Sequence, residues 1–219
     1  LEWVAGRVGP GIVPRRSPRS DLSRLPQPAW EGVDMARYAA MWRARHGMWE
    51  VNLSTARGCP YRCNWCAKPT WGRTYHVRPV REVVAEIEAL RTRYQPDRLW
   101  FTDDIFAIRP GWLAEFRAAM PVPMQFRCIT RVDLVKDEAY VRDLAAAGCV
   151  EVWLGAESGS DPVLAAMDKD ADVAEIERVL KDVPGVSSAL AERLTGGRYV
   201  DVNIRRDAAA RFGLNISDV

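Results

Sequence analysis

Apolar and polar positions along residues 49–170 follow two alternating spacings. Short, nearly continuous apolar runs predict strands at residues 49–55, 98–102, 124–130 and 149–155. Between these runs, apolar residues recur every three or four positions and predict helices at residues 80–94, from Pro110 to Met120, and at residues 136–147. Gly148 ends the last of these helices, where a left-handed cap is favourable for glycine.

The regular succession of strand and helix predicts an α/β fold with parallel strands and right-handed crossovers. Nearly continuous apolar strands are typical of sheets whose two faces are covered by helices or by a filled interior. In such sheets, functional groups gather beyond the carboxyl ends of the strands. A loop rich in cysteine follows the first strand, Asp103 and Asp104 end the second, Arg131 ends the third, and Glu157 follows the fourth. These groups are therefore expected to meet at one rim.

Composition narrows the classes of function. The chain has 219 residues and a formal net charge of +2, which does not favour a nucleic acid or an anionic membrane as partner. Its longest apolar runs are far shorter than the ~20 residues of a spanning helix, and the first residues lack the pattern of a secretory signal. Five cysteines, three of them crowded together, favour a metal or redox site in a reducing compartment over a disulfide framework. We therefore expect a cytoplasmic protein.

The crowded cysteines are Cys59, Cys63 and Cys66, within the stretch RGCPYRCNWC at residues 57–66. Three thiolates on one short loop can bind three corners of a [4Fe–4S] cluster and leave the fourth iron without a protein thiolate. That iron would then be open to an exogenous ligand. An electron-carrying ferredoxin would close the fourth corner with another cysteine.

A structural zinc site is the alternative for the same three cysteines, and it needs a fourth ligand. Cys128 and Cys149 lie inside predicted strands, where a small buried thiol is the simpler interpretation. His76 is the best remaining candidate. A non-catalytic iron–sulfur or zinc-binding module thus stays open beside the reactive cluster.

The cysteine loop, with aromatic Trp65 before its last cysteine, resembles the signature of the radical S-adenosylmethionine (SAM) superfamily. Residues 20–170 as a whole resemble the cobalamin-dependent branch of that superfamily, most clearly in the stretches LSRLPQPAW, FTDDIF, RCITRVD and WLGAESGSDPVL. The resemblance implies a partial radical SAM barrel of four βα units. The complete barrel of the superfamily has six.

The resemblance also implies a reaction. The open iron of a [4Fe–4S] cluster would bind SAM, and an external electron donor would allow its reductive cleavage to a 5′-deoxyadenosyl radical. That radical would act on a small-molecule substrate, with cobalamin-dependent methyl transfer or cyclisation as the outcomes found in this branch. Cobalamin would be held by an upstream domain, for which residues 1–48 would serve as the following linker or arm. Within that arm, residues 6–30 are rich in Pro, Arg and Ser and are expected to be irregular, with Trp30 pinning their end.

The resemblance assigns cofactor-binding roles to six further residues: Trp65, Asp103, Asp104, Arg131, Glu157 and Ser158. The acidic pair after the second strand would contact the SAM amino group, Arg131 its carboxylate, and the pair after the fourth strand its ribose or carboxylate. Trp65 would pack near the adenine. The structural alternatives are a solvated helix cap for the acidic pair, an acid near a helix start for Glu157, a surface ion pair for Arg131 and core packing for Trp65.

The C-terminal residues change character. Residues 174–219 resemble a stretch of the porter domain of heavy-metal efflux pumps of the resistance-nodulation-division type, although no transport activity follows from such a fragment. The expected organisation is therefore a truncated radical SAM core at residues 49–170 and an unrelated segment at residues 171–219, forming a short α/β appendage. In a truncated or chimeric chain the fourth strand would expose its edge unless residues 199–204 covered it, and the core would be catalytically inert.

Overall fold

A parallel four-stranded sheet forms the centre of the computed structural model, which describes residues 21–66 and 73–181. The strand order is β1–β4–β5–β6, with β1 at Glu50–Leu53, β4 at Arg98–Phe101, β5 at Phe126–Thr130 and β6 at Cys149–Leu154. Every pairing in this sheet is parallel. The predicted α/β class and the four predicted strands are confirmed.

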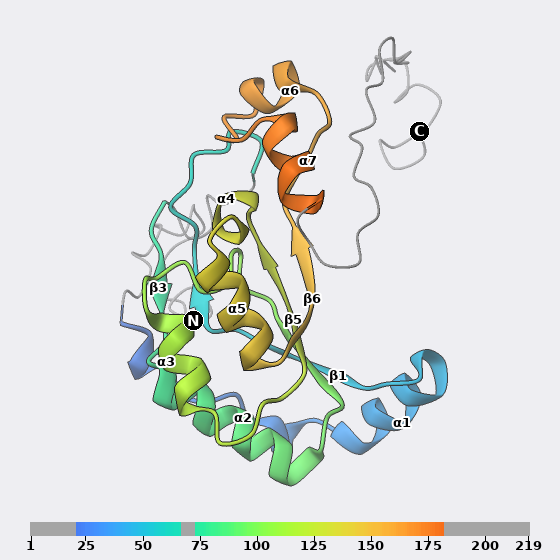
Figure 1. Cartoon of the computed structure of the whole chain (residues 1–219). Coiled ribbons are helices and arrows are strands. Elements are labelled where there is room, and N and C mark those ends of the chain that lie inside the picture. Colours follow the sequence, from blue (N-terminus) through green and yellow to red (C-terminus); the bar gives the residue numbers. More distant parts are fainter. Residues whose placement is uncertain (1–20, 67–72, 182–219) are drawn as a thin grey trace, which may run out of the picture.

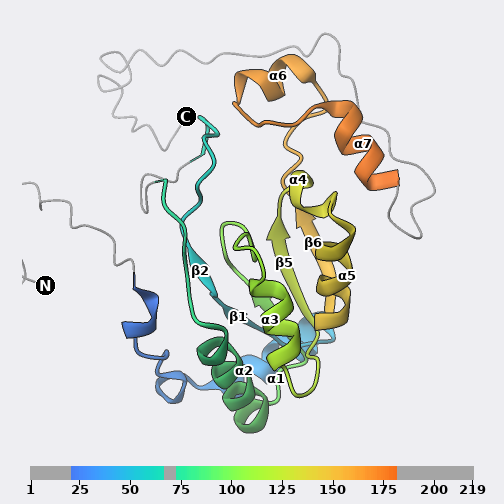
Figure 2. The ribbon, with the colours of Figure 1, turned by 60° about the vertical axis from the view of Figure 1, so that its left-hand side comes forward.

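The crossover helices lie side by side on one face of the sheet (Figures 1 and 2). They are α2 (Val80–Tyr94), α3 (Trp112–Ala119) and α5 (Glu138–Ala147). The third crossover contains a short extra helix, α4 (Val132–Val135), because Asp137 caps a new helix start by accepting a hydrogen bond from the Ala139 N–H at 2.9 Å. The single helix predicted at residues 136–147 therefore begins at Glu138.

An aromatic cluster fills the space between the helices and the sheet. Phe101 of β4 stacks on Phe106, with ring centroids 4.7 Å apart, and meets Phe126 of β5 edge-on at 4.9 Å. Trp112 and Phe116 of α3 complete the cluster, and all of these rings are fully or almost fully buried. Burial alternates along β1, β4 and β5, so the face of the sheet that lies under the helices carries the core.

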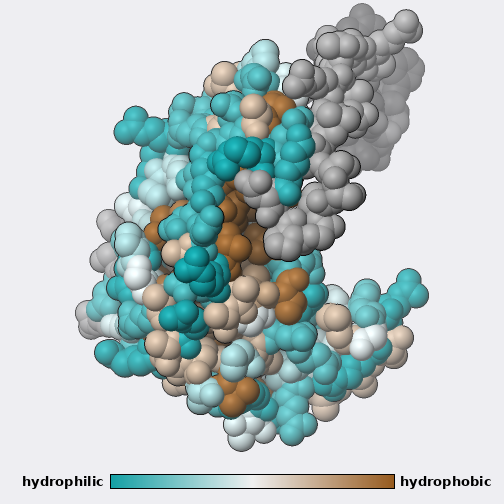
Figure 3. Space-filling view, viewed as in Figure 1, coloured by the Kyte–Doolittle hydropathy of each residue, from teal (hydrophilic) through white to brown (hydrophobic). Residues whose placement is uncertain are grey.

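The opposite face of the sheet carries no helix among the described residues. It carries four charged side chains in mutual ion pairs, Glu50, Arg98, Arg127 and Glu151. The guanidinium of Arg127 also lies 4.0 Å from the ring centroid of Trp100. The edge strand β6 leaves Val150 and Trp153 exposed. On the side that faces the viewer in Figures 1 and 3, where the crossover helices lie, apolar side chains gather between α4 and β6.

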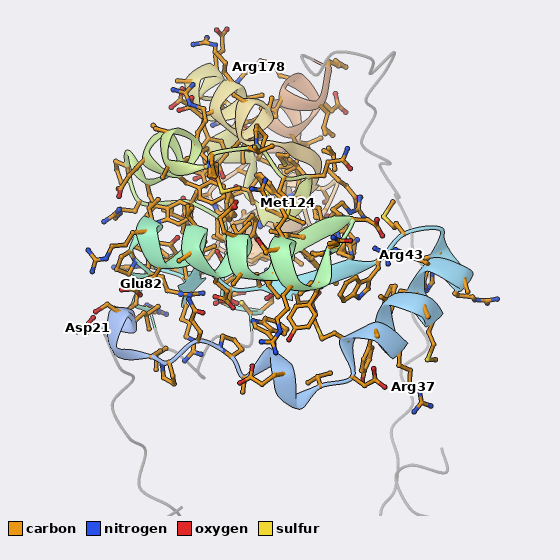
Figure 4. The ribbon with its side chains drawn as sticks, turned by 90° about the horizontal axis from the view of Figure 1, so that it is seen from below. Asp21, Arg37, Arg43, Glu82, Met124 and Arg178 are labelled. Atoms are coloured by element: carbon orange, nitrogen blue, oxygen red, sulfur yellow. The ribbon has the colours of Figure 1, made fainter. Side chains whose placement is uncertain are left out.

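From residue 21 onward, the chain before β1 forms more regular structure than predicted. It forms two short 3₁₀ turns, η1 (Leu22–Arg24) and η2 (Trp30–Gly32), and then helix α1 (Met35–His46), which the sequence did not predict. Trp30 packs against the core, as expected, and its indole donates to Glu86 of α2 at 3.2 Å. Figure 4 shows this segment running alongside α2, from Asp21 to Arg37 and Arg43 of α1. Residues 1–20 of the predicted arm at residues 1–48 lie outside the described residues.

Beyond β6, helices α6 (Asp161–Ala166) and α7 (Val173–Lys181) form a second small core with α4. Its buried members are Val132, Leu164, Val173, Ile176 and Val179. Helix α7 thus packs on the sheet domain although it falls within the predicted segment 171–219. Residues 182–219 of that segment, which include residues 199–204, lie outside the described residues. None of the described helices is long and apolar enough to span a membrane.

A buried carboxylate connects β4 to the turn that follows β1. Asp103 is 2% exposed and accepts hydrogen bonds from the backbone N–H groups of Thr55 and Ala56, at 2.7 and 2.9 Å, and from the Thr55 hydroxyl. Ser54 donates to it at 3.1 Å. The turn leads into β2 (Ala56–Arg57), which pairs antiparallel with β3 (His76–Val77) and starts the cysteine loop. Burial raises the pKa of Asp103 to about 6, although these hydrogen bonds act in the opposite direction.

The glycine that ends α5 is expected to tolerate no side chain. Gly148 has φ of +104°, and an added Cβ would lie 2.5 Å from the carbonyl oxygen of Met124. Gly47, which ends α1, has φ of +76° and no atom within 4 Å of such a Cβ. We expect Gly47→Ala to destabilise the protein by about 1 kcal/mol through its backbone alone, and Gly148→Ala by at least about 2 kcal/mol more through the clash. Urea unfolding measures both, and equal losses would contradict this interpretation.

The raised pKa of Asp103 predicts a pH dependence of stability. The folded state holds this proton up to about pH 6, whereas the unfolded state releases it near 3.8. The stability of the wild type relative to Asp103→Asn should therefore be greatest below pH 4 and fall as the pH rises to about 6.5. At about 1.4 kcal/mol per pKa unit, the fall is at most about 3 kcal/mol. Denaturant unfolding of both proteins across this range measures the difference, and a difference independent of pH would refute the assignment.

Candidate functional site

A cavity of about 170 Å³ lies beyond the carboxyl ends of the strands. Its lining includes the three cysteines of the loop together with Trp65, Asp104, Arg131 and Glu157, so the structure brings most of the predicted site residues to one place. Ile105, Ile129, Thr130, Gly155 and Lys169 complete the lining. Asp103 and Ser158 are not part of it.

The cysteine loop is anchored on two sides. On one side, the backbone N–H of Gly58 donates to Asp104 at 3.2 Å. On the other, the backbone N–H of Asn64 donates to the carbonyl oxygen of Met167 at 3.1 Å, in the turn after α6. Cys59 is buried, Cys63 is half-buried and Cys66 is exposed, so the three thiols lie at different depths around the cavity.

No fourth thiol lines this cavity. Cys128 and Cys149 lie in β5 and β6, with their sulfur atoms 4.0 Å apart, as expected for small side chains within strands. His76, the candidate fourth ligand for zinc, is also absent from the lining. Across residues 21–66 and 73–181, no three His, Cys, Asp or Glu side chains are grouped as ligands of a single metal ion.

The donor set suits a [4Fe–4S] cluster better than a single ion. Each cysteine of such a cluster binds a different iron, so its thiolates are spread around the group. The ligands of one zinc ion must instead converge on one point. The three thiols surround one cavity, do not converge on one point and have no fourth thiol beside them. This arrangement matches that of a [4Fe–4S] cluster.

The two adjacent acidic residues after β4 face different surroundings. Asp103 points away from the cavity and supports the turn after β1, as described above. Asp104 lines the cavity and accepts the Gly58 N–H. Asp103 is buried and is not the solvated helix cap that was the alternative, whereas Asp104 is exposed as well as lining the cavity. Only Asp104 is placed where a ligand in the cavity can meet its carboxylate.

Arg131 is 4% exposed, and its guanidinium is held from several sides. It donates to Asp133 at 2.7 Å and to the carbonyl oxygen of Lys169 at 2.8 Å, and it lies 3.7 Å from the centroid of the Tyr61 ring. A third hydrogen bond reaches the sulfur of Cys63 at 3.6 Å. In the ion pair with Asp133, Arg131 is buried and the side chain of Asp133 is 30% exposed, in contrast to the surface pair that was the structural alternative.

Charges in this group stabilise one another. Burial acts to raise the pKa of Asp133, but hydrogen bonds from Tyr61 and Arg131 hold it below its usual value. Burial likewise acts to lower the pKa of Arg131, but Asp133 raises it above its usual value. Burial and the bond to Asp133 raise the pKa of Tyr61 to about 12, so the phenol remains a donor. The group therefore stays charged as an ion pair at neutral pH.

A second buried cation lines the cavity, and the sequence did not predict it. Lys169 is 4% exposed, and its ammonium group lies 2.9 Å from the carboxylate of Glu157. A Cβ at Gly155 would lie 2.9 Å from that carboxylate and 3.1 Å from the ammonium, so the pair depends on glycine there. Ser158 points elsewhere and accepts the Ser160 N–H at 3.1 Å, at the start of α6. Trp65 remains 53% exposed at the rim, which argues against core packing.

Two stretches of the chain have known relatives of different kinds. Over 52 residues, 24% of this chain, it is 58% identical to the cation efflux system protein CusA of Escherichia coli (strain K12), of which it covers 5%. Over 132 residues, 58% of this chain, it is 30% identical to the anaerobic magnesium-protoporphyrin IX monomethyl ester cyclase of Cereibacter sphaeroides, of which it covers 22%. The chain thus spans less than a quarter of the length of either relative. The predicted resemblance to an efflux pump is confirmed by the first match.

The fold is shared with a solved radical SAM enzyme. The structure of the methyltransferase TsrM from Kitasatospora setae, with tryptophan substrate and a SAM analogue bound, matches 65% of this chain and 29% of that chain. The TM-score is 0.54 at 23% sequence identity. A second structure of TsrM, with cobalamin and a [4Fe–4S] cluster bound, matches with a TM-score of 0.51 at 24% identity and covers 59% of this chain and 26% of that chain.

The sequence profile of the Radical SAM superfamily matches residues 53–187, which is more than half of the chain. The match begins at the end of β1 and extends through α7, and it includes the cysteine loop and every side chain that lines the cavity. This chain therefore belongs to the radical SAM superfamily.

Proposed function

We propose that this chain holds a [4Fe–4S] cluster on Cys59, Cys63 and Cys66 and uses it to cleave SAM reductively. The observation that carries the proposal is the set of three thiols, without a fourth, around one cavity beyond the strand ends. When bound, the cluster supplies the electron that converts SAM to a 5′-deoxyadenosyl radical. The protein's part is to orient SAM and to exclude water.

The charged side chains of the cavity suit the amino-acid end of SAM. That end is a zwitterion, and the cavity offers the carboxylates of Asp104 and Glu157 beside the ammonium of Lys169. Carboxylates would accept hydrogen bonds from the SAM amino group, and Lys169 would donate to its carboxylate. The exposed ring of Trp65 at the rim is available to pack on the adenine. This arrangement transfers to Lys169 the role that the resemblance implied for Arg131.

The reaction that follows radical formation is inferred from the relatives. One is a cyclase, and the solved neighbour is a methyltransferase with cobalamin bound in one of its structures. Methyl transfer or cyclisation of a small-molecule substrate, with cobalamin held by a further domain and electrons from an external donor, is the corresponding proposal for this chain. Reduced thiols are required, which supports placement in the cytoplasm.

One observation favours a second candidate, a catalytically inert module. About a quarter of the chain is similar to CusA, and the helix-free face and edge of β6 are open among the described residues. A core interrupted by an unrelated segment would still bind a cluster but would not cleave SAM. Incubation of the reduced, cluster-loaded chain with SAM separates the two, because only the first candidate yields 5′-deoxyadenosine.

The cluster proposal predicts which cysteines bind iron. After anaerobic reconstitution, the wild type should hold about four irons per chain, and Cys59→Ala should lose most of this iron and its visible absorbance. Cys128→Ala is the matched control, because Cys128 is also buried but lies outside the cavity. Iron analysis and absorbance spectra measure both. Retention of iron by Cys59→Ala, or equal loss in the control, would exclude the assignment, whereas a colourless zinc protein that loses its metal in His76→Ala would support the zinc site.

The SAM proposal predicts a role for Lys169 that iron content does not report. Loss of one charge-assisted hydrogen bond costs about 1.5–3 kcal/mol, so Lys169→Met should weaken SAM binding about 10- to 100-fold with the iron content unchanged. Lys136→Met is the control, because Lys136 also pairs with a glutamate, Glu175, but away from the cavity. Anaerobic calorimetric titration of the cluster-loaded proteins measures the affinities. Unchanged SAM affinity in Lys169→Met would rule out this contact.

A further inference from the structure

One cationic side chain in the cavity contacts a proposed cluster ligand directly. Nη1 of Arg131 lies 3.6 Å from the sulfur of Cys63, within the range of an N–H···S hydrogen bond. Arg131 is almost fully buried, so water screens its charge little. The sulfur of Cys63 therefore lies beside a weakly screened positive charge.

The guanidinium is fixed in this orientation by its other contacts. Nε donates to Asp133 and Nη2 to the carbonyl oxygen of Lys169. Asp133 is itself held by the hydroxyl of Tyr61 at 2.6 Å, and the Tyr61 ring lies under the guanidinium. Because Tyr61 belongs to the cysteine loop and Lys169 to the turn after α6, Arg131 joins the loop, α4 and that turn.

These contacts fit poorly with a grip on the SAM carboxylate. A bidentate grip needs two guanidinium nitrogens that face the same ligand. In this structure each of the three nitrogens already has a partner within the protein. Of these three contacts, the one with the sulfur of Cys63 is the one that packing does not explain.

We propose that Arg131 is a positioning residue that raises the reduction potential of the cluster by donating to the Cys63 sulfur, an inference that rests on the proposed cluster-binding function. Reduction transfers one electron from a low-potential donor and adds one negative charge to the cluster and its thiolates. A positive charge and a hydrogen bond at a ligand sulfur favour the more negative state. Arg131 thus makes the electron transfer that precedes SAM cleavage more favourable.

The test is an anaerobic redox titration of the full, cluster-loaded chain without SAM, followed by electron paramagnetic resonance of the reduced cluster. Arg131→Met should lower the stability of the reduced state about tenfold, which for one electron is a shift of about 59 mV to lower potential. Arg131→Lys keeps the charge and should shift the potential less. Asp133→Asn removes the opposing charge and should shift it upward.

The outcomes separate this inference from the proposed function. A wild type that takes up no iron overturns both. A wild type and an Arg131→Met variant with equal iron and equal potential overturn the role of Arg131 alone, and a loss of SAM affinity in that variant would return it to the carboxylate role. If Arg131→Met fails to hold iron, the reduction potential of the cluster in Asp133→Asn is the deciding measurement. A potential at or below that of the wild type refutes the proposal.

Discussion

The site depends on one buried carboxylate that is not part of the cavity. The cysteine loop begins only a few residues after β1, and the turn that leads into it is held by a residue next to the neighbouring strand. Asp103, at the end of the neighbouring strand β4, accepts two backbone N–H groups of the turn after β1 and the hydroxyl of Thr55. Since its neighbour Asp104 faces the cavity and accepts the N–H of Gly58, the acidic pair supports the loop from below and contributes to its inner wall.

Much of this arrangement could be predicted because it follows local patterns. Continuous apolar runs identified β1, β4, β5 and β6, and the three- and four-residue spacing identified α2 to the residue. The gathering of the functional groups at one rim of the sheet could be predicted from the parallel topology alone. Helix α1 was missed because its apolar residues are not concentrated on one face, and only Met35 and Ala39 are buried. Lys169 was missed because its contact with Glu157 exists only once the turn after α6 folds back over the cavity. Asp103 and Asp104 alternate in direction, but the sequence does not say which one faces inward.

The helix-free face of the sheet differs in its chemistry from the face that carries the core. Four ion-paired side chains and Trp100 and Trp153 occupy this face, in place of the apolar residues of a packed core. Two of the charges, on Arg98 and Glu50, are largely buried by their neighbours alone. A polar, aromatic surface of this kind suits the interior wall of a barrel, where side chains surround a ligand.

The two cations of the cavity differ in how firmly they are held, and this difference divides their roles. Arg131 is fixed through three nitrogens to three different partners, so moving it would disturb the cysteine loop, α4 and the turn after α6 together. Lys169 is paired with Glu157 through one short contact at the cavity wall. A zwitterionic ligand could enter between Lys169 and Glu157 and pair with both charges, and the ion pair between these two side chains would be lost. The rigid cation beside the thiols, Arg131, suits a metal group that stays in the site. The exchangeable cation beside the ligand space, Lys169, suits a cosubstrate that is replaced in every turnover.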